Sequence, residues 1–82
     1  MHTPLTTIPY IGKKIASYFE RVGIMGVEDL RGRDPEDIYQ AICDDHGYRI
    51  DRCLLYTCRS AVYYAEHAKH DPEKLKWWNW KD

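Results

Sequence analysis

Hydrophobic residues recur along this chain at intervals of three and four, the spacing of one face of an α-helix, and no segment alternates as a β-strand does. The pattern is clearest at residues 12–22 and 51–68. The sequence therefore predicts an all-α fold. The residues expected to be buried are Ile11, Ile15, Tyr18, Phe19 and Val22 near the first segment, and Leu54, Leu55, Cys58, Ala61, Val62 and Ala65 on the second.

Proline, glycine and aspartate mark where the helices begin and end. Asp34-Pro35 and Asp71-Pro72 each place an N-cap residue before a proline at the first helical position. Pro9 prevents a helix from continuing, and Gly23 suits a left-handed helix end. We expect helical segments at about residues 4–8, 12–22, 26–30, 34–43 and 51–68, and a short final helix with Trp77, Trp78 and Trp80.

The segment from Leu5 to Ala16 reads as a short helix, a tight turn and a second helix that opens on Gly12. Its pattern, hydrophobic-x-x-hydrophobic-Pro-x-Ile-Gly-x-x-x-Ala, resembles a helix-hairpin-helix motif, which clamps the phosphate backbone in many DNA-handling proteins. Backbone N–H groups at a helix N-terminus favour an anion. Tyr10 stands where the motif usually has its first glycine, which lets the backbone approach a phosphate closely.

The order of the segments predicts a tandem helix-hairpin-helix domain of five main helices, closed by the Trp-rich C-terminal helix. The whole chain, residues 1–82, forms one domain in this interpretation. Its parts are a first hairpin at about 4–22, a connector at 23–33, a second hairpin at about 34–68 and a C-terminal cap at 69–82. The second hairpin is degenerate, because Gly47 is its only glycine.

The chain as a whole resembles the small bacterial pathogenicity locus family of helix-hairpin-helix proteins, some of which carry a mitomycin-resistance label. The segments that carry this resemblance are 8–12, 27–30, 34–36, 51–56, 59–65 and the aromatic ending 75–82. The resemblance implies a fold more than a function, and the mitomycin label points towards DNA damage. It extends loosely to the terminal domain of competence-regulator proteins.

The distribution of charge along the chain affects how well a nucleic-acid partner fits. The net charge is −1, whereas most nucleic-acid-binding domains are clearly basic. Residues 34–51 hold six Asp/Glu and one Lys/Arg, and both flanking segments have a small positive excess. A weakly basic surface built from the two ends is compatible with this pattern. No apolar run is long enough to span a membrane and no signal peptide is evident, so a cytoplasmic location is expected.

The leading hypothesis is a non-enzymatic protein that contacts the DNA backbone without sequence preference. The residues assigned to it are Pro9, Ile11, Gly12, Lys13 and Lys14 in the first hairpin, and Gly47, Tyr48, Arg49 and Arg52 in the second. The alternative is a protein-interaction module or homodimer that uses the Arg/Tyr face of the longest helix and the tail. Its residues are Tyr56, Arg59, Tyr63, Trp77 and Trp80. In a third interpretation, the tail folds back over that face and makes these residues internal packing partners.

Metal binding and catalysis have little support in the sequence. Cys43, His46, Cys53 and Cys58 offer soft ligands, but their spacing is not that of a zinc finger. Cys53 and Cys58 point about 140° apart around one helix. We therefore expect neither a metal nor another cofactor. No small-molecule substrate is evident from the sequence. Catalysis is not expected, because a single domain of 82 residues has little room for a base-sized pocket.

Overall fold

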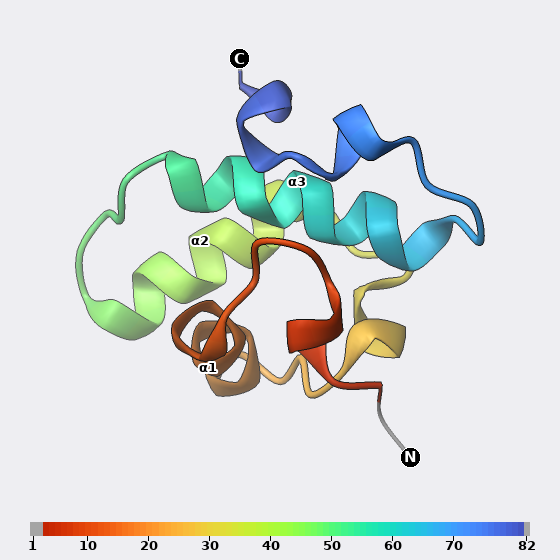
Figure 1. The fold of residues 1–82 in the computed structure, drawn as a ribbon. Coiled ribbons are helices and arrows are strands. Elements are labelled where there is room, and N and C mark those ends of the chain that lie inside the picture. Colours follow the sequence, from red (N-terminus) through yellow and green to blue (C-terminus); the bar gives the residue numbers. More distant parts are fainter. Residues whose placement is uncertain (1–2, 82) are drawn as a thin grey trace.

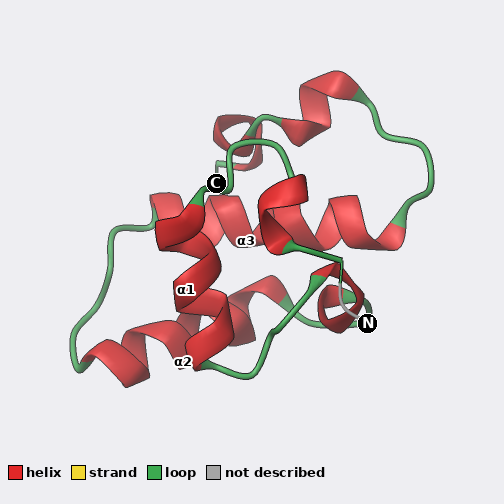
Figure 2. Cartoon of the chain, turned by 60° about the horizontal axis from the view of Figure 1, so that its bottom comes forward, coloured by secondary structure: helices red, strands yellow, loops and turns green. Residues whose placement is uncertain are grey.

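The computed structural model describes residues 3–81, and every regular element within that range is a helix (Figures 1 and 2). This confirms the all-α class. The α-helices are α1 (Lys13–Arg21), α2 (Pro35–His46) and α3 (Cys53–Glu66). The 3-10 turns are η1 (Leu5–Thr7), η2 (Val27–Leu30), η3 (Pro72–Leu75) and η4 (Trp77–Trp80).

Three α-helices form in the described part of the chain instead of the five main helices expected. The segment before Pro9 forms only η1, because Pro4 and Pro9 leave too few residues between them for an α-helical hydrogen-bond ladder. The Trp-rich end is not one helix. It is interrupted at Lys76, whose extended backbone (φ −82°, ψ 115°) separates η3 from η4.

Helix α2 is longer than the expected segment, which ended at Cys43. It continues to His46 because Gly47 is the residue that adopts the left-handed conformation, with φ 77°. The Gly47 N–H donates to the Cys43 carbonyl at 2.9 Å and closes the last turn. At the other end, Asp34 caps α2 as expected by accepting the Glu36 N–H at 2.9 Å.

Helix α3 lies across the middle of the molecule. Helices α1 and α2 lie on one side of it and the C-terminal turns η3 and η4 on the other (Figure 1). Figure 2 shows the same arrangement from a second direction. All six residues expected to be buried on the longest helix are buried. On α1, Phe19 is buried, whereas Ile15 and Tyr18 are half-buried against the core, as is Val22 just after the helix.

No helix among residues 3–81 has the length and apolar composition needed to cross a membrane.

Candidate functional site

The turn of the first hairpin keeps the backbone shape of a glycine turn although its residue is tyrosine. Tyr10 has φ 69°, in the left-handed region that favours glycine. The Ile11 N–H donates to the Ile8 carbonyl at 3.2 Å and closes the turn. Both isoleucines are buried, whereas the Tyr10 side chain is 55% exposed. The hairpin is therefore anchored by its apolar residues and presents a tyrosine at its tip.

Helix α1 begins with groups that suit an anion. Its N-cap is Gly12, which has extended backbone geometry and no side chain that could accept the first N–H groups. The first turn carries no acidic residue, and Lys13 and Lys14 are both exposed there. A Cβ added at Gly12 would meet no atom within 4 Å. The α1 N-terminus is thus open and positively flanked, with Pro9 half-buried behind it.

The segment predicted as the second hairpin differs from the first at the start of its helix. Its helix, α3, is preceded by Asp51, whose carboxylate accepts the Cys53 N–H at 2.8 Å. This hydrogen bond lowers the pKa of Asp51 below its usual value. Tyr48, Arg49 and Arg52 are exposed, as expected for binding residues. However, the aspartate already places a negative charge at the helix end where a phosphate would bind.

Two contacts join the second hairpin to α1. Arg21 Nε lies 2.5 Å from Asp45 Oδ2, and this hydrogen-bonded pair lowers the pKa of Asp45. The His46 ring packs edge-on against Tyr18 and Tyr48, with centroids 4.7 and 5.9 Å away. His46 therefore serves as an aromatic spacer between the two hairpins, a role that the sequence did not indicate.

The C-terminal segment folds back over α3, which is the third of the interpretations offered by the sequence. Arg59 Nη1 donates to the Trp80 carbonyl at 2.7 Å, and Ser60 Oγ donates to the Leu75 carbonyl at 3.2 Å. The Asp71 N–H donates to the Tyr63 hydroxyl at 2.8 Å. Residues assigned to a partner surface are thus engaged within the chain. The half-buried Tyr56 also contacts Arg59, whose guanidinium carbon Cζ lies 5.7 Å from the centroid of the tyrosine ring.

The remaining tryptophans link the tail to itself and to the first hairpin. Trp80 Nε1 donates to the Lys74 carbonyl at 2.7 Å. Trp77 is half-buried and packs edge-on against Trp78, with ring centroids 5.7 Å apart. Trp78 in turn contacts Tyr10. The tail is therefore part of the packed structure and closes one side of α3.

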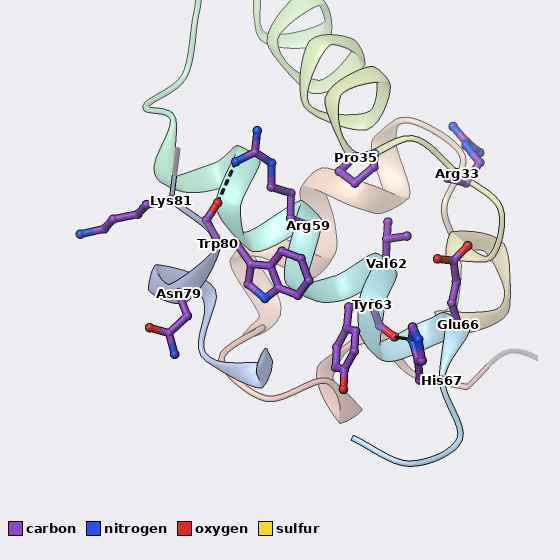
Figure 3. A pocket seen from close by; sticks show the side chains of 10 residues that line it. All are labelled: Arg33, Pro35, Arg59, Val62, Tyr63, Glu66, His67, Asn79, Trp80 and Lys81. Carbon is purple, nitrogen blue, oxygen red and sulfur yellow. Dashed lines mark hydrogen bonds between the residues drawn. The ribbon is translucent and has the colours of Figure 1, made fainter. Parts of the chain in front are cut away.

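A groove of 610 Å³ lies where the tail meets α3 and the start of α2 (Figure 3). The Trp80 and Tyr63 rings line it, with centroids 5.7 Å apart. The other lining residues are Arg33, Pro35, Arg59, Val62, Glu66, His67, Asn79 and Lys81. The sequence does not indicate Arg33, Asn79 or Lys81 as site residues, because residues from separate segments meet here without any local motif.

The cysteines are separated by their environments. Cys43 and Cys58 are buried and Cys53 is exposed, and all three are free thiols. Burial raises the pKa of Cys58 to about 12, so it remains a neutral thiol at ordinary pH. Among residues 3–81, no group of three or more His, Cys, Asp and Glu side chains is arranged to hold a metal ion.

Comparison with known proteins places this chain in a family. Residues 2–82 match the model of the family described as pathogenicity locus. The chain belongs to the pathogenicity locus family. It is also 42% identical over 76 residues to the mitomycin resistance protein McrB of Streptomyces lavendulae, an alignment that spans 93% of this chain and 69% of that relative. No solved structure matches the chain.

Membership of the pathogenicity locus family matches the expectation drawn from the sequence segments. Those segments have clear roles in the structure of this member. Residues 8–12 form the first turn, 34–36 start α2, and 51–65 form most of α3 with its cap. In the aromatic ending, Trp77–Trp80 form η4 against α3. In this chain, the family's features therefore build the hairpin and the tail that covers α3.

Proposed function

We propose that this member of the pathogenicity locus family is a non-enzymatic DNA-binding protein, which holds the phosphate backbone at the N-terminus of α1 without reading sequence. The observation that carries the proposal is the combination of an uncapped Gly12 with the exposed pair Lys13 and Lys14. Unpaired N–H groups and two ammonium groups at one helix end offer hydrogen bonds and charge to the same anion.

The proposal treats residues 4–22 and 34–68 as two helix-hairpin-helix units of unequal function. The left-handed backbone at Tyr10 supports this view of the first unit, because a hairpin glycine would adopt the same φ. The Asp51 cap makes the second unit a poorer phosphate site. The DNA contact therefore rests on the first hairpin, and we expect Gly47, Tyr48, Arg49 and Arg52 to contribute less.

The relative's name adds a second line of support. It refers to resistance to mitomycin, and a backbone-binding protein is one way in which a small domain could act on damaged DNA. The alternative of a protein-interaction surface has less support, because Arg59, Tyr63 and Trp80 are used within the chain to hold the tail.

The test is fluorescence anisotropy of labelled DNA, titrated with the protein across a salt series. We expect binding that weakens with salt, since each neutralised phosphate releases counterions. Joint substitution of Lys13→Glu and Lys14→Glu should abolish the binding. Absence of binding at low salt would overturn the proposal, and binding that survives the double substitution would exclude the assigned surface.

A sharper variant is Gly12→Asp. The new carboxylate would cap α1 in open space, so we expect the fold to keep or gain stability while DNA binding is lost. Ala68→Asp is the matched control, since it adds the same charge at an exposed position outside the first hairpin. If the two substitutions weaken DNA binding equally, the change in net charge alone explains the loss, and a site at Gly12 is contradicted.

A further inference from the structure

The groove between the tail, α3 and the start of α2 has the properties of a ligand site of its own. Its volume of 610 Å³ lies within the range of pockets that hold small organic ligands. The groove is formed by three segments that are distant in sequence and fixed to one another. Arg59 of α3 links all three, through the Trp80 carbonyl of the tail at 2.7 Å and the Glu36 carboxylate of α2 at 3.5 Å.

The apolar part of the groove suits the face of a flat ring. The Trp80 indole and the Tyr63 ring both border it, and Pro35 and Val62 add aliphatic surface (Figure 3). Each aromatic ring is fixed by a hydrogen bond, from Trp80 Nε1 to the Lys74 carbonyl and from the Asp71 N–H to the Tyr63 hydroxyl. Rings already held in place lose little freedom when a ligand stacks against them.

The charges around the groove complement an anion. Arg33 and Lys81 are exposed and lie at opposite ends of it (Figure 3). The carboxylate among the lining residues is Glu66, which accepts the Gly32 N–H at 3.0 Å and retains capacity for a second donor. A ligand that used all of these groups would combine a flat ring bearing N–H donors with a negatively charged group.

We propose that this groove binds a nucleoside monophosphate unit, with its base against Trp80 and Tyr63 and its phosphate at Arg33. The unit is either a free nucleotide or an unpaired nucleotide of a DNA strand, and the chemistry of recognition is the same. An inorganic phosphate would leave the rings unused, and a hydrocarbon would leave the cations unused. None of the residues that line the groove belongs to the α1 N-terminus, so this proposal can be tested independently of the DNA contact proposed there.

The experiment uses the full chain with Trp77→Phe and Trp78→Phe, which leaves Trp80 as the sole indole fluorophore. The probe is deoxyadenosine monophosphate, compared with deoxyadenosine and with inorganic phosphate. We expect saturable quenching of Trp80 by the monophosphate, weaker quenching by deoxyadenosine and none by phosphate. Quenching that stays linear up to about 10 mM, where even weak specific binding would saturate, overturns the proposal.

Variants localise the binding. Arg33→Gln should weaken it about tenfold, the effect of losing one charge-assisted hydrogen bond. Lys69→Gln, the matched loss of one exposed cation outside the groove, should change nothing. Equal affinity in the two variants would exclude the groove. Amide chemical shifts of Val62, Tyr63 and Glu66 in the unsubstituted chain give the same answer without the Trp substitutions.

Two further measurements distinguish a free nucleotide from a strand, and binding in the groove from binding at the first hairpin. The first compares a short oligodeoxyadenylate with the mononucleotide by the quenching of Trp80. Tighter binding of the oligonucleotide would show that the groove takes an unpaired nucleotide of a strand, whereas equal binding would show that it takes the free nucleotide. The Lys13→Glu, Lys14→Glu protein should keep its mononucleotide binding. Loss of binding in that protein would assign the signal to the hairpin and overturn the groove proposal.

Discussion

The ring of Tyr10 packs edge-on against the indole of Trp78, with centroids 5.1 Å apart and an angle of 74° between the planes. This contact joins the tip of the first hairpin to the C-terminal segment across most of the chain length. Both rings stay partly exposed, at 55% and 38%. The residue in the left-handed turn position therefore braces the hairpin against the tail.

Replacing Tyr10 with glycine should change stability little. Glycine removes a left-handed strain of about 1 kcal/mol, but it also loses an aromatic pair worth about 0.5–1.5 kcal/mol. We expect the free energy of unfolding in urea to stay within about 1 kcal/mol of the parent. Tyr10→Val should cost more, because a β-branched residue is poorly tolerated at φ 69° and cannot form the pair. A larger loss of unfolding free energy with glycine than with valine would contradict this explanation.

The contact itself can be measured with a double-mutant cycle between Tyr10→Leu and Trp78→Leu. We expect a coupling energy of about 0.5–1.5 kcal/mol, the usual range for an aromatic pair. Trp77→Leu replaces Trp78→Leu in the control cycle, because Trp77 contacts Trp78 rather than Tyr10 among the described ring pairs. Equal coupling in the two cycles would mean that the ring contact adds nothing specific.

Arg59→Met should loosen the C-terminal segment. Methionine keeps an apolar stem but loses the hydrogen bond to the Trp80 carbonyl and the ion pair with Glu36. Since the arginine side chain is only 21% exposed, we expect a loss of about 1–3 kcal/mol in unfolding free energy. Hydrogen exchange should accelerate at residues 76–80. Unchanged exchange there would show that other contacts hold the tail.

Stability should fall in acid partly through Asp51. Its pKa is lowered in the folded chain by the Cys53 N–H, so its charge stabilises the fold above its unfolded pKa. That contribution is lost as the pH falls through the folded pKa, below about pH 4. Asp51→Asn keeps the acceptor but removes the charge. We expect its melting temperature to be lower than the parent's at neutral pH and to converge with it in acid. A constant difference across this range would contradict the linkage.

Alkylation should distinguish the three cysteines. Iodoacetamide at about pH 8 should modify Cys53 in the folded protein, whereas Cys43 and Cys58 should react only on unfolding because both are buried. Asp51 raises the pKa of Cys53, so Asp51→Asn should speed its modification. Mass spectrometry after short exposures measures the order. Early modification of Cys58 would contradict the burial that raises its pKa to about 12.

The sequence by itself determined where α2 begins, where α1 ends and which face of α3 is buried. Asp34-Pro35 starts α2 and Gly23 adopts φ 88° after α1, as their chemistry predicts. The apolar positions of α3 are buried as their spacing indicates. These signals act within one or two helical turns, where a cap or a steric restriction depends on neighbouring residues alone. For that reason they can be read without knowing the rest of the fold.

Tertiary structure decided the candidate sites. The left-handed Tyr10 is stabilised by a ring 68 residues further along the chain, and only the folded arrangement brings Trp78 to it. The Asp51 carboxylate accepts the Cys53 N–H at the start of α3, whereas Gly12 leaves the start of α1 without a side-chain cap. The groove joins Arg33, Tyr63 and Trp80 from separate segments. Contacts of this kind depend on the packing of the whole chain, and no local pattern of residues encodes them.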